Sequence, residues 1–183
     1  MPPKARFTKE MIIDAAYDLA KEQGMEAVAA REVAKRLNMT VTPIFGSFTN
    51  MAELKQRVYD RARREFLSFL RGALDTAPAY REFALRWIQY AGENPNFYRM
   101  LMTQEGTEQE PMTELIRELL PPLTREITDT FALSQEKAEE ILEYLVIYAN
   151  GIASFRLRGT EPLPQPEIAR GVTRLCTALA AQE

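Results

Sequence analysis

Apolar residues recur every three to four positions along most of the chain, which is the spacing of one face of an α-helix. The first run begins at Met11, with Thr8 expected to cap its start and Gly24 to end it. A shorter run covers residues 30–37, and a third covers residues 41–47. No segment shows the alternation of a strand, so the pattern predicts an all-α protein.

The turn between the second and third runs is only three residues long. Asn38 suits the left-handed conformation that ends a helix, and Thr40 is expected to cap the helix that follows. Pro43 then falls in the first turn of that helix, where proline is tolerated. Asn50 followed by Glu53 predicts a capping box that opens a long fourth helix. Three short helices before a long one, with such a turn, predict a helix-turn-helix.

Prolines divide the rest of the chain into helical segments of about 10 to 25 residues. The two most regular segments are expected at residues 134–157 and 166–181. Both carry a continuous apolar face, so each is expected to pack against other helices.

Charge is unevenly distributed along the chain. The net charge is −3, yet residues 1–71 carry 13 basic and 9 acidic side chains, whereas the remainder carries 10 and 17. The excess of basic residues in the N-terminal part suggests a polyanionic partner for residues 1–71 only. Lys4, Arg6 and Arg31 are placed to meet phosphates, whereas Arg61 and its neighbours on the long helix are expected to form ion pairs at a solvated face.

Enzymatic chemistry finds little support in the sequence. The chain has no histidine, one cysteine and no glycine-rich phosphate loop, and no spacing resembles a metal site, so neither a metal nor a cofactor is expected. A helical enzyme that uses carboxylates such as Glu139 and Glu140 remains a distant alternative. No apolar stretch approaches the length of a membrane span and the start lacks a signal peptide, so we expect a cytoplasmic protein.

Residues 12–54 resemble the DNA-binding domain of the TetR family of transcriptional regulators. The resemblance is carried by IIDAAYDLAKEQG at 12–24, REVAKRLNMT at 31–40 and TPIFGSFTNMAEL at 42–54. A looser likeness to the ligand-binding bodies of these regulators follows at residues 83–101 and 148–159.

The resemblance implies a helix-turn-helix domain at residues 1–50, joined by a long helix to a helical effector-binding and dimerisation domain at residues 51–183. It also implies a homodimer through the last two helices, a palindromic operator of double-stranded DNA, and a repressor that a small-molecule effector releases. The positions expected to contact DNA are Lys4, Arg6, Arg31, Thr40, Val41, Thr42, Pro43, Phe45, Ser47 and Asn50.

The sequence departs from the family pattern at three positions. Asn38 stands where glycine is usual, and is acceptable in the same conformation. Phe45 stands where a tyrosine commonly reaches a phosphate, and it cannot donate a hydrogen bond. Met51 replaces a lysine at the start of the fourth helix. An all-helical interaction or ligand-binding module that has lost DNA binding is therefore the main alternative.

Aromatic and other side chains of the body are candidates for an effector pocket, because such sites are mostly apolar with a few polar groups. The candidates are Phe83, Trp87, Tyr90, Phe97, Tyr98, Met102, Tyr144, Tyr148 and Asn150. Each of them taken singly is more often plain core.

Overall fold

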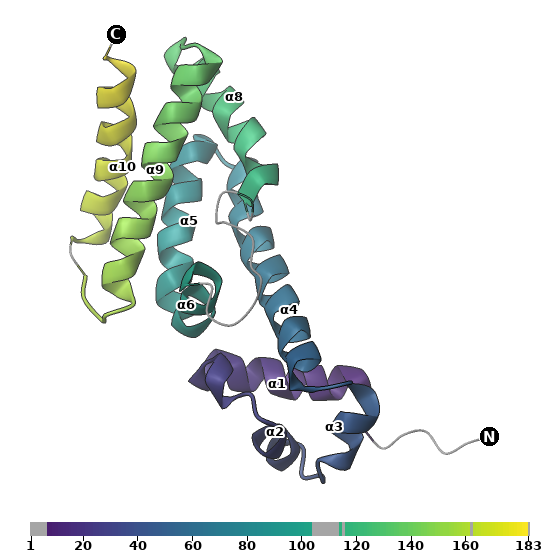
Figure 1. The fold of residues 1–183 in the computed structure, drawn as a ribbon. Helices are drawn as coiled ribbons and strands as arrows, with labels where there is room; N and C mark the ends of the chain where they lie inside the picture. Colours follow the sequence, from purple (N-terminus) through teal and green to yellow (C-terminus); the bar gives the residue numbers. More distant parts are fainter. Residues whose placement is uncertain (1–6, 104–113, 115, 162, 183) are drawn as a thin grey trace. The chain divides into compact units, whose positions relative to one another are not determined.

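The structure is a computed structural model that describes residues 7–103, 114, 116–161 and 163–182 (Figure 1). Every regular element in this part of the chain is a helix, which confirms the predicted all-α class. The chain divides into two compact units. The described residues of 1–64 and 96–109 form the first unit, and those of 65–95 and 110–183 form the second.

The first unit holds the three short helices that the sequence predicts. They are α1 (Lys9–Gln23), α2 (Ala30–Arg36) and α3 (Thr42–Ser47), with a 3-10 turn at Met25–Ala27 between the first two. The side-chain oxygen of Thr8 accepts a hydrogen bond from the Met11 amide at 3.2 Å, and Gly24 ends α1 at a φ of 92°. Both predicted ends of α1 are therefore confirmed.

The turn between α2 and α3 confirms one expectation and corrects another. Asn38 has a φ of 49°, which is the left-handed conformation expected of it. Thr40 does not cap α3: Val41 occupies the position before the helix and no side chain caps it. The reason is Pro43 at the second helical position, because it lacks one of the amide hydrogens that a cap would bind.

Helix α4 (Met51–Arg71) begins with the predicted capping box. The Glu53 amide donates to the Asn50 side-chain oxygen at 2.9 Å, and the Thr49 amide donates to the Glu53 carboxylate at 2.8 Å. Lys9 Nζ lies 3.0 Å from the same carboxylate. The hydrogen bond from the Thr49 amide, followed by that from Lys9, lowers the pKa of Glu53 to about 2. The start of α4 is thus tied to α1.

Helix α6 (Pro95–Thr103) lies in a part of the chain that the sequence assigns to the body, but from Asn96 onward it packs with the first unit. The Phe97 and Tyr17 rings are 4.7 Å apart between centroids. The Asn96 side-chain amide donates to the Lys21 carbonyl oxygen at 2.9 Å. Sequence periodicity does not predict this packing, because it indicates where helices lie along the chain but not which helices they contact.

The second unit is built from the end of α4 and four further long helices. These are α5 (Ala79–Glu93), α8 (Leu120–Phe131), α9 (Gln135–Arg156) and α10 (Gln165–Ala180), with 3-10 turns at Gly72–Asp75 and Arg117–Leu119. Helix α9 packs against α5, α8 and α10 (Figure 1). The predicted helices at 134–157 and 166–181 are confirmed to within one residue at each end.

A carboxylate from α8 completes the start of α5. Both oxygens of Glu126 accept backbone hydrogen bonds, from Ala79 at 2.7 Å and from Tyr80 at 2.8 Å. Helix α5 follows Pro78 and has no capping side chain of its own, so two of its otherwise unpaired amides depend on Glu126. The negative charge also suits the positive end of the helix dipole.

The single cysteine lies in the core of this unit. Cys176 of α10 is fully buried, and burial raises the pKa of its thiol to about 11. At neutral pH the thiol is therefore protonated and shielded from reagents in solution.

Replacing Glu126 with alanine is expected to lower the free energy of unfolding by about 1 kcal/mol, because two α5 amides lose their acceptor. Chemical denaturation of the full chain measures this. The matched control is Glu118→Ala, which removes an exposed ion pair of 2.8 Å to Arg71 and should cost less than about 0.5 kcal/mol. Equal losses in the two variants would contradict the capping role of Glu126.

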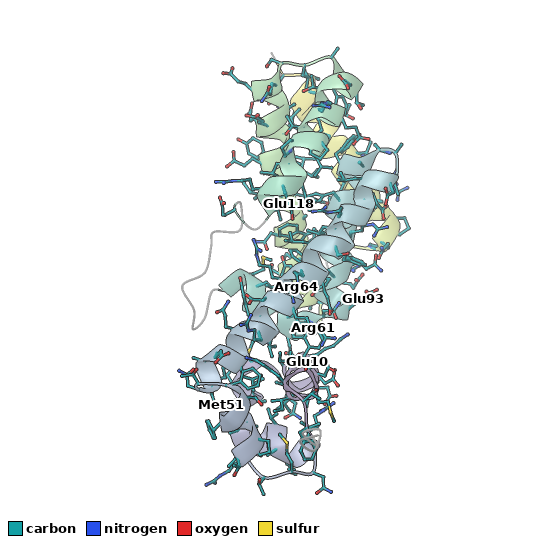
Figure 2. All side chains as sticks on the ribbon, turned by 90° about the vertical axis from the view of Figure 1, so that its right-hand side faces the viewer. Glu10, Met51, Arg61, Arg64, Glu93 and Glu118 are labelled. Atoms are coloured by element: carbon teal, nitrogen blue, oxygen red, sulfur yellow. The ribbon has the colours of Figure 1, made fainter. Side chains whose placement is uncertain are left out.

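Glu53 should make the stability of the first unit depend on pH under acid conditions. Since its folded pKa is lowered, its stabilising effect is complete above the unfolded value of about 4.3 and disappears as the pH falls towards 2. Glu53→Gln should therefore flatten the dependence of unfolding free energy on pH in that window. The control is Glu10→Gln on α1 (labelled in Figure 2), an exposed carboxylate with no hydrogen bond or ion pair to a described residue. A wild-type slope in Glu53→Gln would refute the expectation.

Candidate nucleic-acid interface

Helix α3 has one buried side and one exposed side. Ile44 is 0% exposed and Phe48, directly after the helix, is 3% exposed, so both pack into the first unit. On the other side Val41 is 36% exposed and Phe45 is 53% exposed, and Thr42 is exposed beside them. A face of this kind on the third helix of a helix-turn-helix is the surface that enters the major groove of DNA.

The other predicted DNA-contacting residues around α3 are placed less uniformly. Thr40 and Asn50 are exposed, whereas Pro43 and Ser47 are half-buried on the flank of the helix. The side-chain oxygen of Asn50 already accepts the Glu53 amide. Lys4 and Arg6 lie outside the described residues.

Several cations of the first unit are held by ion pairs within it. Arg36 pairs with Glu22 at 2.5 Å and lies 3.8 Å from Asp18, which ties α2 to α1. Lys9 pairs with Glu53 and lies 4.6 Å above the centre of the Phe48 ring. These two cations therefore stabilise the fold of the unit.

Two other cations are differently placed. Arg31 and Lys35 are exposed one turn apart on α2, and neither makes an ion pair or hydrogen bond with a described residue. In a helix-turn-helix, unpaired cations near the recognition helix are suited to bind the phosphates of the DNA backbone. The sequence prediction includes Arg31 but misses Lys35. The spacing of four residues could have identified Lys35, because it places both side chains on the same face of the helix.

Arg61 and Met51, the remaining residues considered for DNA contact, lie on helix α4. Arg61 pairs with Asp14 of α1 at 2.6 Å and lies 4.0 Å from the centre of the Tyr17 ring. It is thus part of the packing between α1 and α4, which agrees with the expectation of ion pairs. Figure 2 labels Arg61 and also Met51, which is half-buried in the first position of α4.

The second unit has a pocket between α8 and α9 with a volume of about 760 Å³. Its walls are Ile116, Leu120, Pro121, Thr124, Arg125, Thr128, Gln135, Glu139, Leu142, Glu143, Val146 and Ile147. The lining is mostly apolar with a few charged and hydroxyl side chains, which is the composition of sites for small molecules.

None of the nine residues predicted for an effector pocket lines this one. Phe83, Trp87 and Tyr90 belong instead to a cluster of packed aromatic rings in the second unit. The centroid of the Phe66 ring lies 5.3 Å from that of Trp87 and 4.8 Å from that of Tyr90. Burial raises the pKa of Tyr90, so its hydroxyl stays protonated.

The six other candidates are scattered. Phe97, Tyr98 and Met102 lie in the first unit. On α9, Tyr144 is exposed, Asn150 is half-buried and Tyr148 places its hydroxyl against Gly171 of α10. The structure therefore does not gather the nine residues within one unit.

The chain has no histidine, and its cysteine is buried. In the described part of the chain, no three or more acidic or cysteine side chains are grouped so as to hold a metal ion. None of the described helices is both long enough and apolar enough to cross a membrane.

Comparison with known proteins agrees with this geometry. Residues 12–58 match the model of the tetR family of bacterial regulatory proteins. A stretch of 101 residues is 21% identical to YobS, an uncharacterized HTH-type transcriptional regulator of Bacillus subtilis strain 168. That match covers 54% of this chain and 53% of YobS, so the chain spans about half the length of this relative.

Solved structures show the same fold. A transcriptional regulator described from Pseudomonas aeruginosa PAO1 superposes with a TM-score of 0.72 at 16% identity, covering 96% of this chain and 93% of that one. A TetR-like transcriptional regulator from Rhodococcus sp. RHA1 gives a TM-score of 0.63 at 16% identity, with coverage of 95% and 96%. Each of these proteins is described as a transcriptional regulator. Residues 12–58 therefore resemble the tetR family of bacterial regulatory proteins, and the chain has the fold of these solved regulators.

Proposed function

We propose that this chain is a repressor that binds a pseudo-palindromic operator as a homodimer and is released by a small-molecule effector. The observation that carries the proposal is the exposed face of α3, with Val41, Thr42 and Phe45, beside the unpaired cations of α2. Such a face combines groups that read base edges with groups that hold the phosphate backbone.

The proposed contacts divide into two kinds. Arg31 and Lys35 of α2, together with Lys4 and Arg6, bind phosphates and set the position of the unit on the duplex. Val41, Thr42 and Phe45 face the bases, with Thr40, Pro43, Ser47 and Asn50 at the edge of the contact. Phe45 cannot supply the hydrogen bond that a tyrosine would give, so the binding relies more strongly on α2.

Helices α9 and α10 are proposed to form the dimer interface. Tyr144, Ile147 and Phe155 are exposed at 46%, 60% and 45% along one side of α9, and the exposed Gly151 lies between them in the same stripe. Large apolar side chains aligned on a helix are typical of a surface that another protein covers. A second copy would cover the equivalent stripe, as a two-fold interface requires. Two half-sites about 34 Å apart then match the two helix-turn-helix units.

The effector is proposed to bind in the pocket between α8 and α9. Leu142 and Val146 give it an apolar wall, and Arg125, Glu139 and Glu143 supply charged groups at its edge. Neither Arg125 nor Glu143 makes an ion pair with a described residue, so both are available to a ligand. A ligand with different affinities for the DNA-bound and free forms shifts the balance between them.

The test of this function is binding of the purified protein to fragments of its own upstream DNA, titrated across salt with excess nonspecific competitor. Binding that resists competitor and gives a two-fold footprint supports the proposal. Phe45 and Met51 favour one other candidate, a helical module without DNA affinity. Absence of binding both to these fragments and to sequences selected from random duplexes would establish that alternative.

Arg31→Ala should weaken operator binding and reduce the slope of log affinity against log salt by about 1, because one phosphate contact is lost. Since Arg31 is exposed, the unfolding free energy should stay within about 0.5 kcal/mol of the wild type. The control is Arg158→Ala, an exposed cation of the second unit, which should change neither quantity. An unchanged salt slope in Arg31→Ala would exclude this residue from the phosphate contacts.

Phe155→Glu should convert the dimer into a monomer, because a charge would be buried at the proposed interface. Light scattering after size-exclusion chromatography measures the mass directly. Met11→Glu is the matched control, since Met11 is 40% exposed on α1 of the first unit and should leave the dimer intact. A dimer that persists in Phe155→Glu would place the interface elsewhere.

A further inference from the structure

The exposed side of α3 is unusually apolar for a surface. Phe45 is 53% exposed and Val41, one helical turn earlier, is 36% exposed. They are among the few large apolar side chains exposed in the described part of the first unit. No aromatic ring or cation among the described residues lies against the Phe45 ring.

Packing within the unit does not explain this pair. Ile44 and Phe48 are the side chains of this segment that face the core, and both are almost completely buried. Gly46, next to Phe45, has open space where a side chain would begin, since no atom lies within 4 Å of that point. Glycine costs helix stability relative to alanine, and it allows another molecule to approach the backbone closely. The surface around Phe45 is therefore suited to contact with another molecule.

Duplex DNA offers one apolar group in its major groove, the 5-methyl group of thymine. Apolar side chains contact this methyl group, whereas the other features of the base edges require hydrogen bonds. The phenyl ring of Phe45 and the side chain of Val41 offer no hydrogen bond donor. Their Cα atoms are about 6 Å apart along the helix axis, which corresponds to one or two base-pair steps.

We propose that Val41 and Phe45 read thymine methyl groups, so that each operator half-site contains two thymines on adjacent or next-but-one base pairs that these side chains contact. The inference rests on the proposed DNA binding and adds the chemical feature by which the sequence is recognised. Thr42, exposed between the two, remains available for a hydrogen bond to a neighbouring base edge.

The experiment replaces thymine with deoxyuridine, one position at a time, across the bound half-site. Uracil presents the same hydrogen-bonding groups as thymine and lacks only the methyl group, so a loss of affinity reports the methyl contact alone. Two positions should each lose about fourfold in affinity, the effect of burying one methyl-sized group. The remaining thymines should show no change.

Variants then assign each methyl group to a side chain. Phe45→Ala should abolish the difference between thymine and uracil at one of the two positions, and Val41→Ala should reduce it at the other. Phe45→Leu keeps an apolar group and should retain part of the discrimination. Because both side chains are exposed, circular dichroism should show all three variants folded. Arg31→Ala is the control, since a lost phosphate contact weakens thymine and uracil duplexes equally.

The outcomes separate the inference from the function on which it rests. Tight binding to the thymine operator with equal affinity for every uracil variant overturns methyl reading and leaves the regulator proposal intact. Discrimination that survives unchanged in both Phe45→Ala and Val41→Ala overturns the assignment to these residues. Failure to bind any duplex, including sequences selected from random DNA, overturns both.

Discussion

Burial of Ile44 and Phe48 is the constraint on which the first unit depends. Helix α3 has six residues, and a helix of that length does not form in water on its own. Its conformation is therefore imposed by the burial of these two side chains in the first unit, where α3 packs against α1. Because they lie on one side of α3, the same packing turns Val41 and Phe45 towards solvent. The stability of the unit and the orientation of its exposed face thus have a single origin.

The segments on either side of α3 are fixed by local chemistry rather than by core packing. Asn38 supplies the left-handed residue before it, and the box of Asn50 and Glu53 fixes the start of α4 after it. Lys9 joins that box to α1. The charges of this unit therefore have separate uses: some hold helices together, and others, such as Arg31, remain accessible to an external anion.

Much of the fold was predictable from the sequence because helix periodicity and capping are local. The ends of α1 and the capping box of α4 follow from residues within four positions of each other. The prediction for Thr40 was wrong, since Pro43 removes a donor that the cap would need. The association of α6 with α1 was not predicted, because it depends on a contact between Phe97 and Tyr17, which are far apart in the sequence.

The candidate site shows the same division. The exposed side of α3 follows from counting residues around a short helix, so the residues on that side were predictable. Pocket residues were not, because an aromatic side chain that packs a core and one that lines a cavity have the same spacing along a helix. Trp87 belongs to the ring cluster, while the pocket is lined by aliphatic side chains such as Leu142. Only the arrangement of α8 beside α9 in three dimensions reveals that pocket.

The burial of Cys176 has a practical consequence for spectroscopy. Its thiol is buried and protonated at neutral pH, so maleimide reagents should not react with it. A cysteine introduced at the surface would then carry a fluorophore or spin label at one defined position without removal of the native residue. In the proposed homodimer, two such labels would report the distance between the two helix-turn-helix units directly, with and without DNA.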